Sequence, residues 1–163
     1  IINVPQSLTI VTDEEMLEKG MRSIGDIVRY TPGVNTSQGE GHRDAVVFRG
    51  VRSTADFFQD GARDDVQYYR SLYNVEQVEI LRGPNALLFG RGGTGGALNR
   101  VTKKAVIGDS SSSINLGMDS FGAFDVAADI NMDMGDTMAL RVNVHSDTLE
   151  NHRDYYDLSL IHI

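Results

Sequence analysis

The chain has 163 residues, 40% of them hydrophobic, and a formal net charge of −8. The excess of acid argues against nucleic acid or an anionic membrane surface as the partner, and the hydrophobic share is enough for one modest globular domain with an appendage. The absence of cysteine excludes disulfides and thiolate metal sites. No apolar run reaches the length of a membrane-spanning helix.

A strand and two short helices are predicted near the start of the chain. Residues 8–11 form an apolar run typical of a strand. Thr12 and Glu15 have the spacing of a capping box, which begins the first helix. The second helix begins at Ser23 and carries its apolar residues on one face. It ends before Pro32, because the residue before a proline avoids helical angles.

Short strands and polar loops follow. The predicted strands are residues 45–48, 57–59 and 79–81. One predicted loop, residues 35–44, precedes the first of these strands, and a second, residues 63–71, follows the strand at 57–59. Asp60 and Gly61 give a turn signal after the second strand, and residues 73–78 are predicted as one helical turn that leads into the third. Together these elements predict a small mixed sheet with short helices.

Residues 75–104 are rich in glycine. The six glycines are Gly83, Gly90, Gly92, Gly93, Gly95 and Gly96. Three of them satisfy the G-x-G-x-x-G pattern of a dinucleotide loop, which needs a strand before it and a helix after it. The order is reversed here, since residues 85–89 are predicted as a short helix and residues 97–102 as an extended segment. The glycines therefore favour tight turns and close backbone approach over a nucleotide site.

After Lys104, apolar and polar residues alternate in three runs. The runs are residues 114–119, 124–133 and 138–145, joined by turns at 120–122 and 135–137. A period of two indicates strands with one apolar face. Both a water-soluble sandwich and strands that cross a bilayer have this pattern, and on periodicity alone the sandwich is preferred.

Several motifs occur in a fixed order along the first two thirds of the chain. They are Pro5-Gln6-Ser7, Tyr30-Thr31-Pro32-Gly33-Val34, Phe48-Arg49-Gly50, Asp60-Gly61, VEQVEILRGP at 75–84, Leu88-Phe89-Gly90 and Gly95-Gly96-Ala97-Leu98-Asn99. Together they resemble the plug domain of TonB-dependent outer-membrane receptors. Within that family, Tyr68-Tyr69-Arg70 and RGGTGG at 91–96 are most similar to ferric siderophore receptors of the catecholate type.

The resemblance implies an α+β plug domain over residues 1–105, with a small mixed β-sheet and short helices. Residues 106–157 would then be about three antiparallel strands that begin a transmembrane β-barrel, and this context favours barrel strands over a sandwich. A plugged transporter barrel has about 22 strands, so the barrel would be truncated here. The start at Ile1, without an initiator Met or signal peptide, is expected of a processed chain or a fragment. Residues 158–163 break the alternation and are expected to be a non-native tail.

The function implied is that of a receptor in the cell outer membrane of a Gram-negative bacterium. It would bind ferric siderophore and import it when TonB, acting on a segment upstream of the plug, remodels the plug. The expected partners are ferric siderophore, TonB and outer-membrane lipid. No cofactor is expected, because iron would arrive inside its chelate. The four histidines lack metal-ligand spacing and no catalytic set is recognisable, so an enzyme is not expected.

Two sets of residues are predicted to act. The ligand-binding set offers rings and cations from outward loops at 38–44, 52–58 and 64–72: Arg43, Arg52, Phe57, Phe58, Tyr68, Tyr69 and Arg70. The set implied to anchor the plug to acids of the barrel wall is Arg49, Glu76, Glu79 and Arg82. The alternatives are loops that pack under barrel strands for the first set and an ordinary solvated face for the second.

Two rival functions stay open at this point. A receptor for cobalamin or a glycan would use the same plug with different loop residues. A soluble β-rich binding or enzymatic domain predicts instead that the 163 residues fold alone and stay monomeric without detergent.

Overall fold

The computed structural model of the chain describes residues 7–37, 43–53, 56–66, 68–83, 95–150 and 158–162. The predicted helix at 85–89 and most of the glycine loop lie outside these residues. The chain divides into two compact units, Ile1–Lys103 and Lys104–Ile163. Within the described part of the chain, no helix is long and apolar enough to span a membrane.

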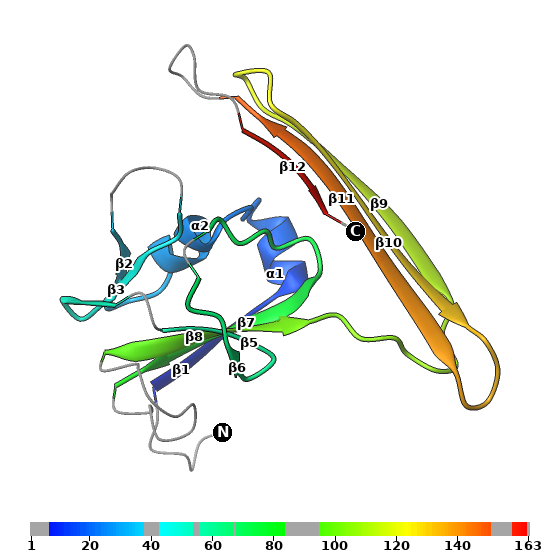
Figure 1. Ribbon diagram of the computed structural model, residues 1–163, viewed down its shortest axis with the longest axis horizontal. Coiled ribbons are helices and arrows are strands. Elements are labelled where there is room, and N and C mark those ends of the chain that lie inside the picture. The colour runs from blue at the N-terminus through cyan, green and yellow to red at the C-terminus, as the bar shows by residue number, and fades with distance from the viewer. Residues whose placement is uncertain are drawn as a thin grey trace. The chain divides into compact units, whose positions relative to one another are not determined.

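The first unit is built on a five-stranded sheet with the order β1-β7-β8-β5-β6 (Figure 1). Its strands are β1 (Ser7–Thr12), β5 (Phe57–Gln59), β6 (Ala62–Arg63), β7 (Val75–Arg82) and β8 (Gly96–Thr102). β5 and β8 pair in parallel and the other neighbours are antiparallel, so the predicted mixed sheet is confirmed. Asp60 and Gly61 join β5 to β6 with φ of 49° and 80°, as a tight hairpin turn requires.

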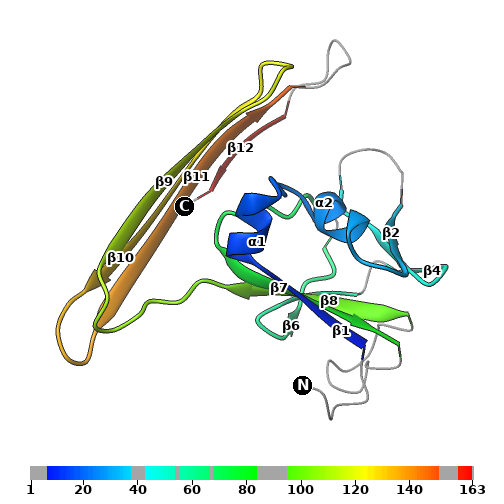
Figure 2. The same cartoon turned by 180° about the vertical axis from the view of Figure 1, so that it is seen from behind.

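Two helices, α1 (Asp13–Glu18) and α2 (Ile24–Arg29), begin at the predicted caps. Thr12 Oγ1 accepts a hydrogen bond from Glu15 N, and Ser23 forms a capping box with Asp26. Both helices lie on the same side of the five-stranded sheet (Figures 1 and 2). The buried apolar face of α2 belongs to the core that the helices form with the sheet. This packing explains why a six-residue helix is stable.

β7 begins earlier than the sequence predicted. Residues 73–78 were expected to form a helical turn, but Val75 and Val78 already lie in β7. The apolar spacing of three arises from an irregularity in the β7–β8 register between Val75 and Gln77, which places both valines in the core. A β-bulge shifts the strand period by one residue and so resembles a helical period.

A second, three-stranded sheet was not predicted in full. It consists of β2 (Val34–Thr36), β3 (Val46–Phe48) and β4 (Val51–Ser53), with β3 in the centre. The prediction of a loop from residue 35 is wrong for its first two residues, because β2 pairs with β3. The loop predicted at 52–58 is wrong at both ends, since Arg52 belongs to β4 and residues 57–58 to β5.

The second unit is an open antiparallel sheet with the order β12-β11-β10-β9. Its strands are β9 (Ser111–Met118), β10 (Phe124–Asp133), β11 (Ala139–Leu149) and β12 (Leu158–His162). The three predicted strands and their two turns are confirmed. The prediction that residues 158–163 leave the strand pattern is wrong, because β12 pairs with β11. The non-native origin of these residues stays a prediction.

The apolar face of this sheet is exposed. Ile114, Leu116 and Met118 alternate along β9 and are 71%, 69% and 76% exposed. Phe124 on β10, the cross-strand partner of Met118, is exposed as well, and so are Ile130 and Val144 on the same face. A water-soluble sheet buries its apolar face and leaves its polar face in solvent. Among the described residues nothing covers the apolar face, whereas a water-soluble sandwich packs this face against a second sheet.

The opposite, polar face is tied together by side chains. Asn131, 3% exposed, donates to the carbonyls of Val106 and Asp109 and accepts from Val106 N at 3.0 Å. Arg141 donates to both carboxylate oxygens of Asp129, at 2.8 and 2.6 Å. Hydrogen-bonded polar groups therefore fix the segment before β9 on the polar side of the sheet.

Candidate functional site

The loop between β6 and β7 is organised around one carboxylate. Asp64 Oδ2 accepts hydrogen bonds from Tyr68 Oη at 2.7 Å, Arg70 Nε at 3.1 Å and Arg100 Nη2 at 2.6 Å. The backbone N–H of Asp64 donates to the carbonyl of Phe57, which fixes the start of the loop on the sheet. Arg100 lies on β8, so Asp64 joins the loop to the centre of the sheet. Charge-assisted bonds of this kind are the strong ones.

Arg70 holds the loop from inside. Its guanidinium donates to the carbonyls of Asp64, Val66 and Tyr68 at 2.8, 2.6 and 3.2 Å. It also lies over two aromatic rings, 3.9 Å from the centroid of Phe57 and 4.5 Å from that of Tyr68. The residue is 2% exposed. Arg70 therefore shapes the loop, and its charge has no surface at which to meet a ligand in this conformation.

Asp44 connects this loop to the segment before β3. Its Oδ2 accepts from the backbone N–H of Arg70 at 2.7 Å, and its own N–H donates to the carbonyl of Tyr68 at 3.2 Å. Burial raises the pKa of Asp44, against the hydrogen bond from Arg70 and the charges of Arg70 and Arg100. Two predicted ligand loops are thus joined by a carboxylate that is costly to keep charged.

Two of the predicted ligand-binding rings lie in the core. Phe57 and Phe58, on β5, are 1% and 2% exposed. Phe57 packs in the main apolar cluster with residues of α2, β3, β7 and β8. β5 lies between β8 and β6 in the sheet, so Phe57 on one face of the strand packs in the core, while Phe58 is buried on the other face. In this structure neither ring offers surface to a ligand. The ring of Phe57 instead packs against the guanidinium of Arg70.

The other members of the predicted ligand-binding set keep accessible surface. Arg52 on β4 and Tyr68 are exposed, and Arg43 and Tyr69 are half-buried. Tyr68 is 36% exposed, the largest value among the four aromatic members. Ligand contact by these residues stays a prediction.

In the predicted anchoring set, Arg49 and Glu76 are exposed. Arg49 occupies the tight turn between β3 and β4 with a φ of 48°, which is rare for a residue other than glycine. Its N–H donates to the carbonyl of Gly33 at 2.9 Å, which helps to hold that backbone. Both side chains are available to a partner surface.

Glu79 and Arg82 are half-buried and have partners within the first unit. Glu79 Oε2 accepts from the side-chain amide of Asn99 at 2.9 Å. Arg82 donates to the carbonyl of Pro32 at 2.7 Å and to Thr9 Oγ1 at 2.8 Å. Their role toward a barrel wall stays a prediction.

Gly95 and Gly96 are required for close packing. A Cβ at Gly95 would lie 2.7 Å from Phe48 Cβ, and one at Gly96 would overlap the carbonyl oxygen of Leu81 and lie 2.6 Å from Phe48 Cδ1. Gly83 N also donates to the carbonyl of Gly95 at 3.0 Å. At these two positions the glycines serve backbone approach, as predicted, and not the cradling of a phosphate.

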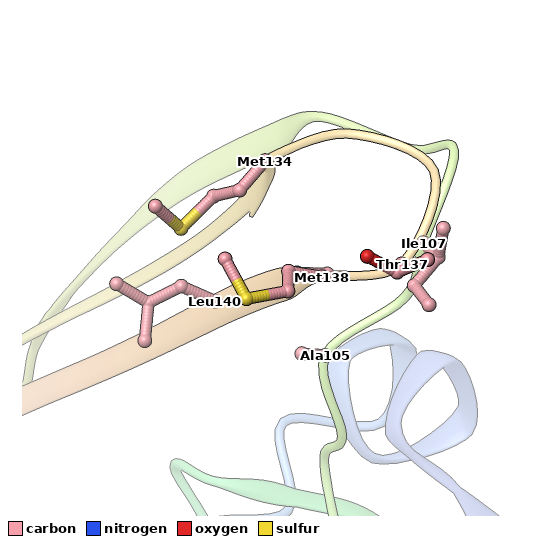
Figure 3. A pocket seen from close by; sticks show the side chains of 7 residues that line it. Ala105, Ile107, Met134, Thr137, Met138 and Leu140 are labelled. Carbon is pink, nitrogen blue, oxygen red and sulfur yellow. The ribbon is translucent and has the colours of Figure 1, made fainter.

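A hollow of about 450 Å³ lies at the β10–β11 turn (Figure 3). Its lining residues are Ala105, Ile107, Met134, Thr137, Met138, Ala139 and Leu140. Thr137 contributes the one side-chain hydroxyl among these seven. A binding site for a small molecule needs several convergent polar groups to fix orientation, so the hollow does not have the character of one.

Comparison with known proteins decides the family. The family described as TonB-dependent Receptor Plug Domain matches residues 1–97. The chain belongs to this plug domain family. The chain is also similar to the probable TonB-dependent receptor BfrD of Bordetella pertussis, with 30% identity over 147 residues that cover 88% of this chain and 20% of the relative. The catecholate siderophore receptor Fiu of Escherichia coli K12 is 29% identical over 156 residues, with the same coverage.

Solved receptors contain the same plug fold and the strands after it. The open form of the ferric-catecholate import receptor Fiu superposes with a TM-score of 0.85 and 26% identity, over 94% of this chain and 23% of that one. The siderophore receptor PiuA from Acinetobacter baumannii gives 0.80 and 27% identity, over 92% and 22%. The chain spans about a fifth of the length of the curated relatives that it matches.

The sequence did not reveal the residues that organise the plug loops, namely Asp44, Asp64 and Arg100. A local signal exists, because Asp64 lies four residues before Tyr68 and six before Arg70. Arg100 is 36 residues away from Asp64 and reaches it through the fold of the sheet. The spacing of residues in the chain could not have predicted that contact.

Proposed function

We propose that this chain is the plug domain and the first barrel strands of an outer-membrane receptor that imports a ferric siderophore with TonB. The observation that carries the proposal is the uncovered apolar face of the sheet that directly follows the plug, with Ile114, Leu116 and Met118 exposed. Strands of an outer-membrane barrel place apolar residues toward lipid and polar residues toward the interior. The relatives PiuA and Fiu, both named as siderophore receptors, support the same interpretation.

The ligand proposed is a ferric catecholate. Support comes from relatives, since Fiu is named as a catecholate receptor, and from side chains of this chain that keep accessible surface. Tyr68 and Tyr69 offer ring surface, and Arg43 and Arg52 offer positive charge that suits an anionic iron complex. The buried Arg70, Phe57 and Phe58 are assigned a supporting role beneath that surface.

Import would follow from plug remodelling. TonB would act on a segment upstream of the plug, and Arg49 and Glu76, both exposed, would hold the plug to acids and bases of the barrel interior until then. Glu79 and Arg82 would contribute through their exposed parts. The relatives are receptors and transporters, so an enzymatic role is not proposed.

Uptake by the complete receptor tests this proposal. The full reading frame is expressed in a Gram-negative strain that lacks its own catecholate receptors, with and without functional TonB, and uptake of radiolabelled iron is measured. We expect iron uptake from a ferric catecholate in the strain with functional TonB and no uptake in the strain without it. Uptake of a ferric hydroxamate or cobalamin instead would point to another nutrient of the same receptor class. A complete lack of uptake would contradict the proposal.

A further inference from the structure

Tyr68 combines exposure with a fixed position. The residue is 36% exposed, while its hydroxyl donates to Asp64 Oδ2 at 2.7 Å and accepts from Arg100 Nη2 at 3.1 Å. An exposed tyrosine normally samples several rotamers, and binding then costs the free energy of fixing one. Folding already fixes the rotamer of Tyr68, because its hydroxyl is hydrogen-bonded to Asp64 and Arg100, so ligand binding does not have to supply that free energy.

Asp64 is the group on which this arrangement depends. The same Oδ2 that accepts from Tyr68 also accepts from Arg70 and Arg100, whose side chains are 1% and 6% exposed. Two buried guanidinium groups therefore hold the carboxylate, and the carboxylate holds the tyrosine. Asp65, the next residue, is exposed and provides a matched acid at the surface.

Arg70 gives the ring a charge on one side. Its Cζ lies 4.5 Å from the Tyr68 centroid, so a cation covers part of the ring from the protein interior. A cation over one face draws electron density from a ring and favours stacking of an electron-rich ring on its free surface. A catecholate is such an electron-rich, anionic ring.

We infer that Asp64 is a positioning residue for ligand binding: it holds Tyr68, backed by Arg70, as a preformed stacking surface for an aromatic ring of an anionic iron chelate. The inference rests on the proposed function and extends it to a residue that does not itself touch the ligand. Asp64 acts through Tyr68, so its contribution must disappear when the ring is absent.

A double-mutant cycle in the full receptor tests this dependence. Affinity for a ferric catecholate is measured for the wild type, Asp64→Asn, Tyr68→Ala and the double variant, together with the uptake rate at saturating ligand. We expect Asp64→Asn to weaken binding about three- to tenfold, the size of one ordinary lost hydrogen bond, with the saturated uptake rate unchanged. Tyr68→Ala should weaken binding at least as much, and the double variant should be no weaker than Tyr68→Ala.

Two further variants complete the test. Asp65→Asn removes the same charge from the neighbouring position and should leave affinity unchanged. If Asp64→Asn fails to reach the outer membrane, Tyr68→Phe breaks the same contact while Asp64 keeps both arginines, and a loss of about threefold is expected.

Three results would overturn the inference. The first is unchanged ligand affinity in Asp64→Asn. The second is unchanged affinity in Tyr68→Phe, if that variant is used because Asp64→Asn does not reach the outer membrane. The third is a full additional loss of affinity when Asp64→Asn is added to Tyr68→Ala, which would show that Asp64 has a general structural role. A wild-type receptor that binds no ferric catecholate would contradict the proposed function, and the inference with it.

Discussion

Tyr68 and Arg70 are two positions apart and have opposite surroundings. The sequence identified them as one cluster of rings and charge for a ligand, yet Arg70 is buried and donates to three carbonyls while Tyr68 keeps exposed surface. Residue type alone cannot separate these roles, because an arginine is equally suited to an anionic ligand and to a loop that needs several donors. Arg70 lies over the ring of Phe57, and Asp64, its ion-pair partner, is also bonded to Arg100; only the folded sheet brings Phe57 and Arg100 close to this loop.

Asp44 should make the loops sensitive to pH. Burial raises its pKa above the ordinary value of an aspartate, so the folded state binds the proton more tightly than the unfolded state does. The stabilisation from that proton is complete below the unfolded pKa and is lost as pH rises through the folded pKa. Asp44→Asn keeps an acceptor for Arg70 N without the charge. In the full receptor, we expect the Arg70 amide of Asp44→Asn to exchange hydrogen as slowly as that of the wild type at acidic pH. At neutral pH, we expect the same amide to be more protected in Asp44→Asn than in the wild type.

The matched control for this measurement is Asp65→Asn, which changes an exposed acid in the same loop region. It should leave the exchange of the Arg70 amide unchanged at every pH. Lower protection in Asp44→Asn than in the wild type at neutral pH would show that the charged carboxylate stabilises the loop, which is the opposite of what its burial predicts.

At the scale of elements, what the sequence predicted well had local causes. α2 follows from its capping box and from Ile24, Ile27 and Val28 on one face. β2 and β4 have three residues each and obtain their structure from pairing with β3, so their own residues carry little signal. β7 was predicted too short, because its bulge mimics a helical spacing. Gly95 and Gly96 at β8 were correctly predicted to allow close packing, because the segments around them did not have the strand-then-helix order that a dinucleotide loop needs.

The start of β8 should not accept a side chain. Gly96 lies against the Leu81 carbonyl and the Phe48 ring, so Gly96→Ala forces backbone or a buried ring to move, at a cost of about 1–3 kcal/mol or more. We expect this variant to reduce the level of protease-resistant receptor in the outer membrane. Gly25→Ala is the control, since its Cβ would meet Ser23 Oγ at 3.4 Å, an ordinary contact. Equal levels of the two variants would contradict the packing role assigned to Gly96.

At the scale of the whole molecule, the two units differ in where they place their apolar residues. The first unit buries its apolar residues in a core formed by helices and sheet, as a water-soluble domain does. The second exposes its apolar face and fixes its polar face with Asn131, Arg141 and Asp129. The period of two predicted the strands but not which face would be buried, because alternation is the same for both solvents. The plug domain before the strands is the context that distinguishes them.

The most direct test of a plug followed by lipid-facing strands is a scan along β10. This chain has no cysteine, so single cysteines can be placed from Val126 to Asn131 in the full receptor, with any cysteine elsewhere in that receptor replaced by serine, and labelled with a spin probe. If the apolar face meets lipid, labels at Val126, Ala128 and Ile130 are reached by oxygen dissolved in the lipid, while labels at Ala127, Asp129 and Asn131 are not. Equal access of a water-soluble relaxation agent to both sets of positions would contradict a lipid-facing sheet.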